Sequence, residues 1–407
     1  MKSKSVYLGW SRLASLVVAA ASALSALSAM TVIDIATDGD AVAATSQHPF
    51  CVGLGENCTG SYSITGGRFY ASANDDSSIF VGKDGGVGHL NISGDAFVDC
   101  QKICLGTTKG SNGVKPKGYL NISENGVLQV RSQMWLGNTD NEYSEVNQTG
   151  GKVESGELVF VGSRGRFKYL LSSGVLSAKK DLQTGKNPDC ESALEMGGGS
   201  VWVGRYFHIG AEGIGTLNQT GGEIVAKRWT AIGRYGINGN GVYKITGGTF
   251  VLDNSGEGLN VGEDGSGMLE VGGDGLVRVD SSEGITLGSA ETGKGALKMT
   301  GGTIATRTIK NGKGVAEYVE FDGATIEVTA GNVNILQGLP NVVLKSGGLT
   351  VDTRGNTVKI KDCVFNVHPG GKITVTGGGT VAFESVSVNL AEKPKESFLF
   401  AETQEAG

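Results

Sequence analysis

The sequence has little proline and no collagen-like glycine period, although it is rich in glycine. Proline accounts for 6 of 407 residues and glycine for 68. Collagen needs glycine at every third position together with abundant proline, so a collagen-like fibre is excluded. Val, Ile and Leu recur at regular intervals, which argues against a disordered glycine-rich linker. The pattern that remains is a chain of many short strands separated by glycine turns.

The sequence also lacks an excess of positive charge and the histidine spacing of a metal site. The net charge is −6, whereas nucleic-acid binding needs a basic surface. The four histidines, His48, His89, His208 and His368, are scattered along the chain without the Cys/His spacing that is typical of zinc sites. We therefore expect no nucleic-acid partner, no metal ion and no cofactor.

Residues 1–44 have the pattern of an export signal peptide. Three Lys or Arg residues precede the stretch 13–30, which is uncharged and rich in Ala, Leu and Val. Cleavage is compatible with the position after Ser28, Ala43 or Ala44. An uncleaved signal anchor is the alternative, since the apolar run reaches the length at which spanning becomes possible. No second apolar stretch follows, so we expect no membrane span in the mature chain.

The six cysteines favour disulfide formation if the chain is exported. Cys51 and Cys58 bracket a glycine-containing loop. Cys100 and Cys104 lie close together in the sequence and need a bend between strands in order to meet. These four residues are the disulfide candidates.

Ten self-similar units of roughly two dozen residues run from Tyr62 to about Thr308. The best preserved, GTLNQTGGEIVAKRWTAIGRYG, begins at Gly215. Each unit holds an apolar–x–x–Ser/Thr–Gly phrase, a second apolar patch, and a third patch that ends in a hydrophobic–Gly step. Patches this short bury their apolar side chains only by stacking on copies of themselves. The repeat therefore predicts an all-β fold, a right-handed parallel β-helix with three short strands in each coil.

The repeat phrase loosens after Thr308, but strand patches and glycine corners continue. Three to four further coils bring the expected total to about 14, a rod on the order of 65 Å at about 4.8 Å per coil. The expected organisation is a signal peptide (1–44), an N-terminal cap (45–59), a short-repeat solenoid (60–316), looser coils (317–390) and a C-terminal tail (391–407). Cys190 and Cys363 then lie seven or eight coils apart, too far for a disulfide. We expect them to be free or bonded to another chain.

Alternation within the first patch predicts one outward side chain per coil. In consecutive coils that position reads Asn91, Asn121, Asn147, Leu171, Glu195, Asn218, Lys244, Glu270 and Lys298. The three leading asparagines predict an amide ladder, and the Lys–Glu–Lys end predicts a ladder of alternating charge. Four of the asparagines also match the Asn-x-Ser/Thr glycosylation signal, but they follow from the repeat phrase, which favours the ladder.

Two stretches of the sequence resemble known repeats. LNQTGGE with the following AIGRYG resembles the short repeat of type V secretion and PEP-CTERM-associated repeat proteins, and VEFDGATIEVTAG with GGLTVDTRGNTVKI resembles the autotransporter-associated β-strand region. Together they cover roughly residues 60–385. The resemblance implies export from a Gram-negative bacterium, display at the outer-membrane surface or release, and no catalytic residues. No C-terminal sorting signal is recognised, so the mode of surface attachment stays open.

A few charged and aromatic residues are candidates for a surface that faces a glycan. They are Arg164, Arg166, Lys168, Arg205, Tyr206, Arg228, Trp229, Arg234 and Tyr235. We expect a non-enzymatic secreted or surface-displayed β-solenoid, an adhesin or structural passenger protein, with glycans, extracellular matrix or a cell surface as partners and an unknown oligomeric state. The alternative is a polysaccharide lyase or hydrolase that acts on acidic glycans, which requires carboxylates or a base grouped on one face.

Overall fold

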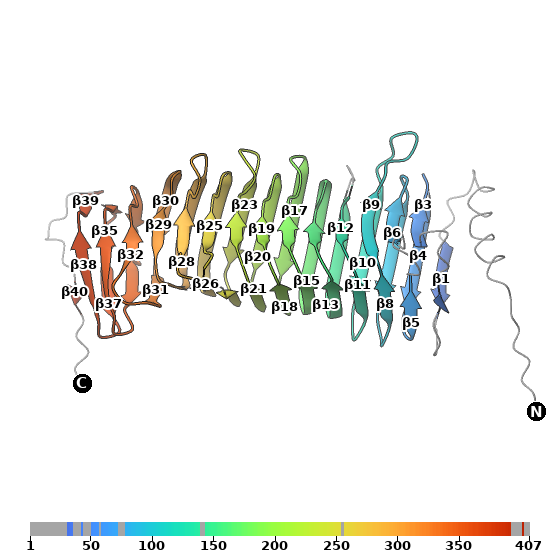
Figure 1. The fold of residues 1–407 in the computed structure, drawn as a ribbon, viewed down its shortest axis with the longest axis horizontal. Helices are drawn as coiled ribbons and strands as arrows, with labels where there is room; N and C mark the ends of the chain where they lie inside the picture. The colour runs from blue at the N-terminus through green and yellow to red at the C-terminus, as the bar shows by residue number, and fades with distance from the viewer. Residues whose placement is uncertain are drawn as a thin grey trace, which may run out of the picture.

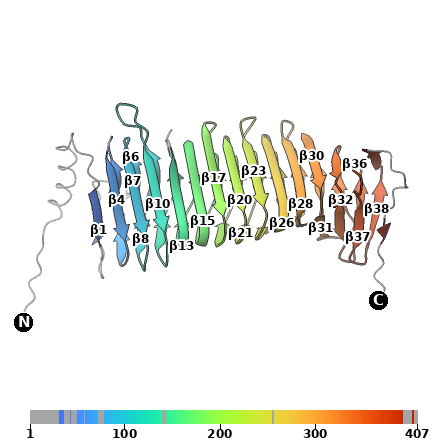
Figure 2. The same cartoon turned by 180° about the vertical axis from the view of Figure 1, so that it is seen from behind.

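The described part of the chain forms one elongated rod of stacked strands (Figures 1 and 2). The structure, a computed structural model, describes residues 31–35, 42–43, 50–56, 58–71, 78–138, 143–253, 256–391 and 401–402. Every regular element in these ranges is a β-strand, and the strands pair in parallel to form a β-solenoid of about 13 turns. The all-β solenoid predicted from the repeat is therefore confirmed, with a coil count close to the expected 14.

Each turn contributes a strand to each of three sides of the rod, which we call faces 1, 2 and 3 in the order of the repeat. Face 3 is a separate 14-stranded sheet. Its strands are β3 (Phe50–Leu54), β6 (Ser78–Lys83), β9 (Lys102–Thr107), β12 (Met134–Leu136), β14 (Val159–Val161), β16 (Leu182–Thr184), β19 (Phe207–Ile209), β22 (Thr230–Ile232), β25 (Leu259–Val261), β27 (Ile285–Leu287), β29 (Ile309–Asn311), β32 (Val333–Gln337), β35 (Thr357–Lys361) and β38 (Thr380–Glu384).

Faces 1 and 2 belong to one continuous 26-stranded sheet that bends at the corner between them. Face 1 consists of β1 (Thr31–Ile35), β4 (Thr59–Ile64), β7 (Val87–Ile92), β10 (Lys117–Ile122), β17 (Cys190–Met196), β20 (Ile214–Gln219), β23 (Asn240–Ile245), β30 (Val315–Phe321), β33 (Val342–Leu344), β36 (Val364–Val367) and β39 (Ser387–Leu390). Face 2 consists of β2 (Val42–Ala43), β5 (Arg68–Tyr70), β8 (Phe97–Cys100), β11 (Val127–Val130), β18 (Ser200–Val203), β21 (Glu223–Ala226), β24 (Thr249–Asp253), β31 (Ala324–Val328), β34 (Leu349–Asp352), β37 (Ile373–Thr376) and β40 (Ala401–Glu402). Four long strands serve both faces: β13 (Ser144–Ser155), β15 (Gly165–Ala178), β26 (Ser266–Asp280) and β28 (Lys294–Thr306).

The stack runs without a break across several of the expected boundaries. Strand β3, inside the expected N-terminal cap, already pairs with β6 on face 3. Strands β1 and β2 pair with β4 and β5, so cleavage after Ser28 would retain them and cleavage after Ala44 would remove them. Ser28 and Ala44 themselves lie outside the described residues.

The rod has a single continuous core because equivalent residues stack in register. In β7, Leu90 and Ile92 are fully buried, while Asn91 between them points outward. Leu90 pairs with Leu120 and Ile92 with Ile122 in the next coil. Each such buried side chain contributes about 1.5–3 kcal/mol of hydrophobic stabilisation relative to exposure, before the cost of ordering the chain.

Two buried hydrogen bonds connect neighbouring coils inside this apolar column. The Tyr169 hydroxyl donates to Gln148 Oε1 at 2.7 Å, and the Tyr243 hydroxyl donates to Gln219 Oε1 at 2.5 Å. Both glutamines come from the Asn-Gln-Thr-Gly-Gly phrase. Their amide groups donate to backbone carbonyls, at 3.0 Å from Gln148 to Val175 and at 3.1 Å from Gln219 to Thr249. The inward Gln of this phrase is thus satisfied only when the next coil supplies a Tyr.

A hydrophobic–Gly step ends several face-3 strands, and the step that ends β22 is a sharp corner. Gly233 has a φ of 73°, and a Cβ placed there would lie 1.9 Å from the carbonyl oxygen of Ser266 in the next coil. Only glycine combines that left-handed backbone with such a close approach. The step therefore fixes where this coil leaves face 3.

No disulfide joins the four candidate cysteines within the part of the chain that the structure describes. Cys100 belongs to the apolar core, whereas Cys104 lies between the core residues Ile103 and Leu105 and so points to the outer side of face 3. The expected bend brings the two residues near each other but directs their thiols to opposite sides of the wall. Burial raises the pKa of Cys104 to about 12, so the reactive thiolate is scarce at neutral pH.

Cys51 also points outward, between Phe50 and Val52, while the Cys58 sulfur packs beside Gly55. Cys190 in β17 and Cys363, which directly precedes β36, are separated by seven successive strand pairings. At about 4.8 Å per pairing, this distance excludes a bond between them within one chain.

Replacing Tyr169 with Phe should destabilise the protein by about 1–3 kcal/mol, because Gln148 Oε1 would lose its donor in the core. The free energy of unfolding from urea titration measures the effect. The control is Tyr119→Phe: the Tyr119 ring stacks on His89 on the outer side of face 1, and the change should cost under about 0.5 kcal/mol. Equal effects of the two changes would contradict the proposed core hydrogen bond.

Replacing Gly233 with Ala should cost on the order of 3 kcal/mol or more, because a left-handed φ and a clash with the next coil combine. Gly236→Ala is the matched control, since Gly236 also has a positive φ, of 90°, but no heavy atom lies within 4 Å of an added Cβ. That variant should lose only about 1 kcal/mol. Thermal unfolding of both variants separates the clash from the backbone strain.

Candidate functional site

The outward side chains of face 1 form a ladder along the rod. Asn121 pairs in register with Asn91 and with Asn147, and its amide donates to Asn91 Oδ1 at 2.8 Å. Further along, Lys244 pairs with Glu270, with 3.9 Å between Nζ and Oε2, and Glu270 pairs with Lys298. Exposed cross-strand contacts of this kind contribute under about 1 kcal/mol each.

The expected position of Leu171 in this ladder is wrong by one residue. Leu171 is buried, and Leu170 takes the outward position between Asn147 and Glu195. The reason is that Tyr169, not Leu170, takes the inward position that pairs with Val146 of the preceding coil. The ladder also extends beyond the recognised repeats, since Asn389 donates to Asn366 Oδ1 at 3.0 Å.

The nine candidate glycan-facing residues divide between different sides of the rod. Arg166 and Lys168 are outward residues of β15 on face 1, where they lie 3.4 Å from Glu191 and 3.9 Å from Glu195. Arg164 lies in the turn before β15, and Arg228 lies in the turn before β22; both are exposed. The other five gather over face 3.

On face 3, Arg205 and Tyr206 are fixed by one buried carboxylate. The Arg205 guanidinium donates two hydrogen bonds to Asp181, at 2.6 and 2.7 Å, and the Tyr206 backbone N–H donates to the same carboxylate at 3.1 Å. The Tyr206 ring meets the Trp229 ring edge-on, with 6.1 Å between centroids. The positive charge of Arg205 is therefore neutralised inside the chain.

Arg234 is the centre of this face-3 cluster. Its guanidinium carbon lies 4.2 Å from the Trp229 ring centroid and 4.3 Å from that of Tyr235. Nη1 lies 2.5 Å from His208 Nε2, and Nε lies 3.0 Å from Glu263 Oε2. Only 14% of the Arg234 side chain is exposed, so this cation is largely shielded from solvent.

Sequence reasoning missed two titratable groups of the cluster, His208 and Glu263. Burial, together with Arg234, Lys186 and Arg205, lowers the pKa of His208 to about 3. Burial raises the pKa of Glu263 to about 7, although Arg234 acts in the opposite direction. Its Oε2 accepts no hydrogen bond within the described residues, because the contact with Arg234 lacks the alignment that a hydrogen bond needs. No local motif marks either residue, since their partners lie one coil away.

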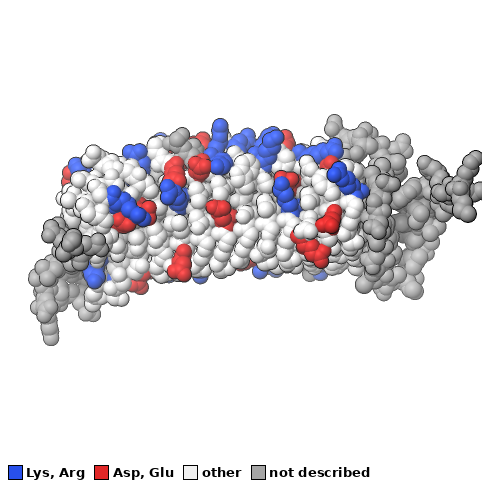
Figure 3. Space-filling model, turned by 90° about the horizontal axis from the view of Figure 1, so that it is seen from below, with Lys and Arg blue, Asp and Glu red and all other residues white. Residues whose placement is uncertain are grey.

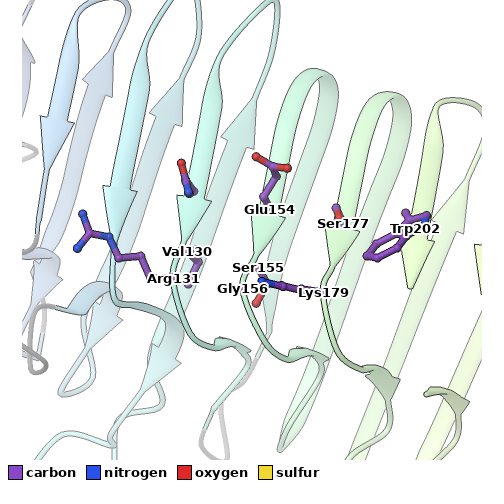
Figure 4. A pocket seen from close by; sticks show the side chains of 9 residues that line it. Val130, Arg131, Glu154, Ser155, Gly156, Ser177, Lys179 and Trp202 are labelled. Carbon is purple, nitrogen blue, oxygen red and sulfur yellow. The ribbon is translucent and has the colours of Figure 1, made fainter. Parts of the chain in front are cut away.

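A second candidate site, which sequence reasoning also missed, is a groove of about 430 Å³ on face 2. It runs across β11, β13, β15 and β18, where Gln129, Glu154, Ser177 and Trp202 occupy the same outward position in successive coils. Figure 4 shows Arg131 and Trp202 at opposite ends of the groove, with Glu154 and Ser177 between them. The available signal was the lone Trp in a row of smaller side chains.

Charges of both signs are mixed over the side of the rod seen in Figure 3, and many Lys or Arg side chains lie next to a carboxylate. None of the described segments contains a helix long and apolar enough to cross a membrane. Across the same described ranges, no three His, Cys, Asp or Glu side chains are grouped so that they could hold a metal ion.

Comparison with known proteins gave no match: no family model, no curated protein and no solved structure matches this chain.

The buried His208 predicts a loss of stability in acid. Its folded-state pKa of about 3 lies below the ordinary value near 6.5, so the contribution is present above pH 6.5 and is lost as the pH falls toward 3. His208→Gln removes the titrating group. Between pH 6.5 and 4, the free energy of unfolding should fall by up to about 3 kcal/mol more in the wild type than in this variant.

The half-buried His89 provides the comparison for this experiment. Partial burial also lowers its pKa, but without the three neighbouring cations. His89→Gln should therefore change the pH dependence less than His208→Gln does. Identical pH profiles for the wild type and His208→Gln would contradict the burial of a neutral imidazole.

Proposed function

We propose that this chain is a non-enzymatic, exported or surface-displayed β-solenoid that acts as an adhesin or structural passenger protein. The resemblance to type V secretion and PEP-CTERM-associated repeats, and to the autotransporter-associated β-strand region, supports display on a Gram-negative cell surface. The rod is suited to this role because parallel stacking extends three solvent-facing surfaces over about 13 turns.

The observation that carries the proposal is that the charged groups of the face-3 cluster are paired with one another. A lyase or hydrolase needs a carboxylate or base that reaches the substrate, usually with a cation beside it. Here the carboxylate of Asp181 is engaged by Arg205, and Arg234 is enclosed by Trp229, Tyr235, His208 and Glu263. The charged groups hold one another, which favours recognition of a partner without turnover.

The polysaccharide lyase or hydrolase stays as a second candidate because of one specific observation. Glu263 has a pKa of about 7 and lies beside Arg234, next to the half-exposed Tyr235. A carboxyl group that titrates near neutral pH is typical of a general acid. If the protein is an enzyme, Glu263 is the residue on which its chemistry depends.

Incubation of the purified full-length protein with acidic polysaccharides tests the two functions. We expect retention of the protein on glycan-coated or cell surfaces, without new reducing ends or unsaturated products. Turnover that is lost in Glu263→Gln would overturn the adhesin proposal. Glu212→Gln is the matched control, since Glu212 is a nearby carboxylate paired with Lys186 at 3.4 Å.

A further inference from the structure

The groove on face 2 follows one outward row of side chains across four coils. Its outward row begins with Gln129 and ends with Trp202, and the small residues Ser177 and Gly156 form part of its lining. Four successive coils line it, which spans about 14 Å along the rod at about 4.8 Å per coil. The small residues Ser177 and Gly156 leave space beside the longer side chains of Glu154 and Trp202, which accounts for the hollow.

Trp202 presents an aromatic surface to solvent at one end of this groove. Its side chain is 37% exposed, and no other ring or cation packs against it in the described part of the chain. Its indole lies against the Cα of Gly204, where an added Cβ would come within 2.9 Å of Cη2. By contrast, Trp135 packs on Phe160 at 4.4 Å and Trp229 packs on Arg234. The exposed indole offers a flat apolar surface with polar groups beside it, as small-ligand sites do.

The charges that line the groove leave one cation unmatched. Arg131 is neutralised by Asp99 at 2.8 Å, and Glu154 is neutralised by Lys152 at 2.8 Å. Among the described residues, no carboxylate lies within ion-pair distance of Lys179. The adjacent Lys180 differs, because it donates to Glu157 at 2.7 Å. The Lys179 ammonium group in the groove is therefore not neutralised by any described carboxylate.

We propose that this groove binds an acidic oligosaccharide, with a sugar ring on the Trp202 indole and a carboxylate of the same chain near Lys179. A pyranose ring has an apolar face that suits the indole and hydroxyl groups that suit Gln129, Glu154 and Ser177. A hydrophobic peptide fits less well, because the outward row contains only one apolar side chain. The open groove follows the rod, so a polymer longer than the hollow can pass through it. This inference rests on the proposed function, for which it supplies a ligand class and a site.

The experiment is titration of the full-length protein with a uronic-acid oligosaccharide, and with a neutral oligosaccharide of the same length, by calorimetry. Trp202→Ala should weaken binding of the acidic oligosaccharide about 5- to 12-fold, since stacking on an aromatic ring contributes on the order of 1–1.5 kcal/mol. Lys179→Ala should weaken binding of the acidic ligand about 5-fold and remove the preference over the neutral one. Lys180→Ala changes the same charge at the next residue and should leave binding unchanged.

Thermal unfolding of each variant verifies that the solenoid is intact. No binding by the wild type, equal affinity for the two oligosaccharides, or wild-type affinity in Trp202→Ala would each overturn the groove proposal. Retention of the wild type on cell surfaces without turnover, unaffected by Trp202→Ala, would leave the adhesin proposal standing while this one fails. Turnover that depends on Glu263 would overturn the adhesin proposal. It would not overturn binding in the groove, because Glu263 lies on face 3 and the groove lies on face 2.

Discussion

Parallel, in-register pairing of each strand with its counterpart one coil away is the interaction on which the rest of this structure depends. It places Leu on Leu and Ile on Ile inside the rod, and Asn on Asn outside it. A single coil has too little apolar surface to hold itself together, so stability accrues between neighbours. Glycine corners such as Gly233 are a consequence of the same constraint, because the backbone of the next coil approaches them too closely for a side chain.

The surface chemistry of the protein follows from stacking as well. A charged side chain in one coil meets the residue at the same position in the next, and several of these pairs are of opposite sign. This arrangement encloses Arg234 in the face-3 cluster, whereas Lys179 in the groove has no carboxylate partner among the residues that the structure describes. We therefore expect such a rod to bind a partner at departures from the ladder, where a small residue opens space or a charge lacks its counterpart.

The sequence predicted the fold class, the approximate number of coils and most of the face-1 register, because the repeat phrase states which residues alternate. It misplaced Leu171, because Tyr169 takes the inward position that pairs with Val146, and the repeat phrase does not indicate this. It grouped Arg166 with Arg234, although the two lie on different faces, since linear order does not show which side of a coil a turn faces. The groove was missed because its lining comes from four different coils, and linear order does not show that Gln129, Glu154 and Trp202 share one outward row.

The two buried Tyr–Gln pairs have a consequence for how this chain assembles. Self-similar repeats can mispair during folding. In such a mispaired state a coil docks on the wrong neighbour and the intervening repeat loops out. The inward Gln accepts its hydrogen bond from a Tyr hydroxyl of the next coil in the sequence. A skipped repeat would therefore leave a buried amide oxygen without a donor in the core. The pairs at Gln148 and Gln219 thus specify the register of neighbouring coils in an otherwise repetitive core.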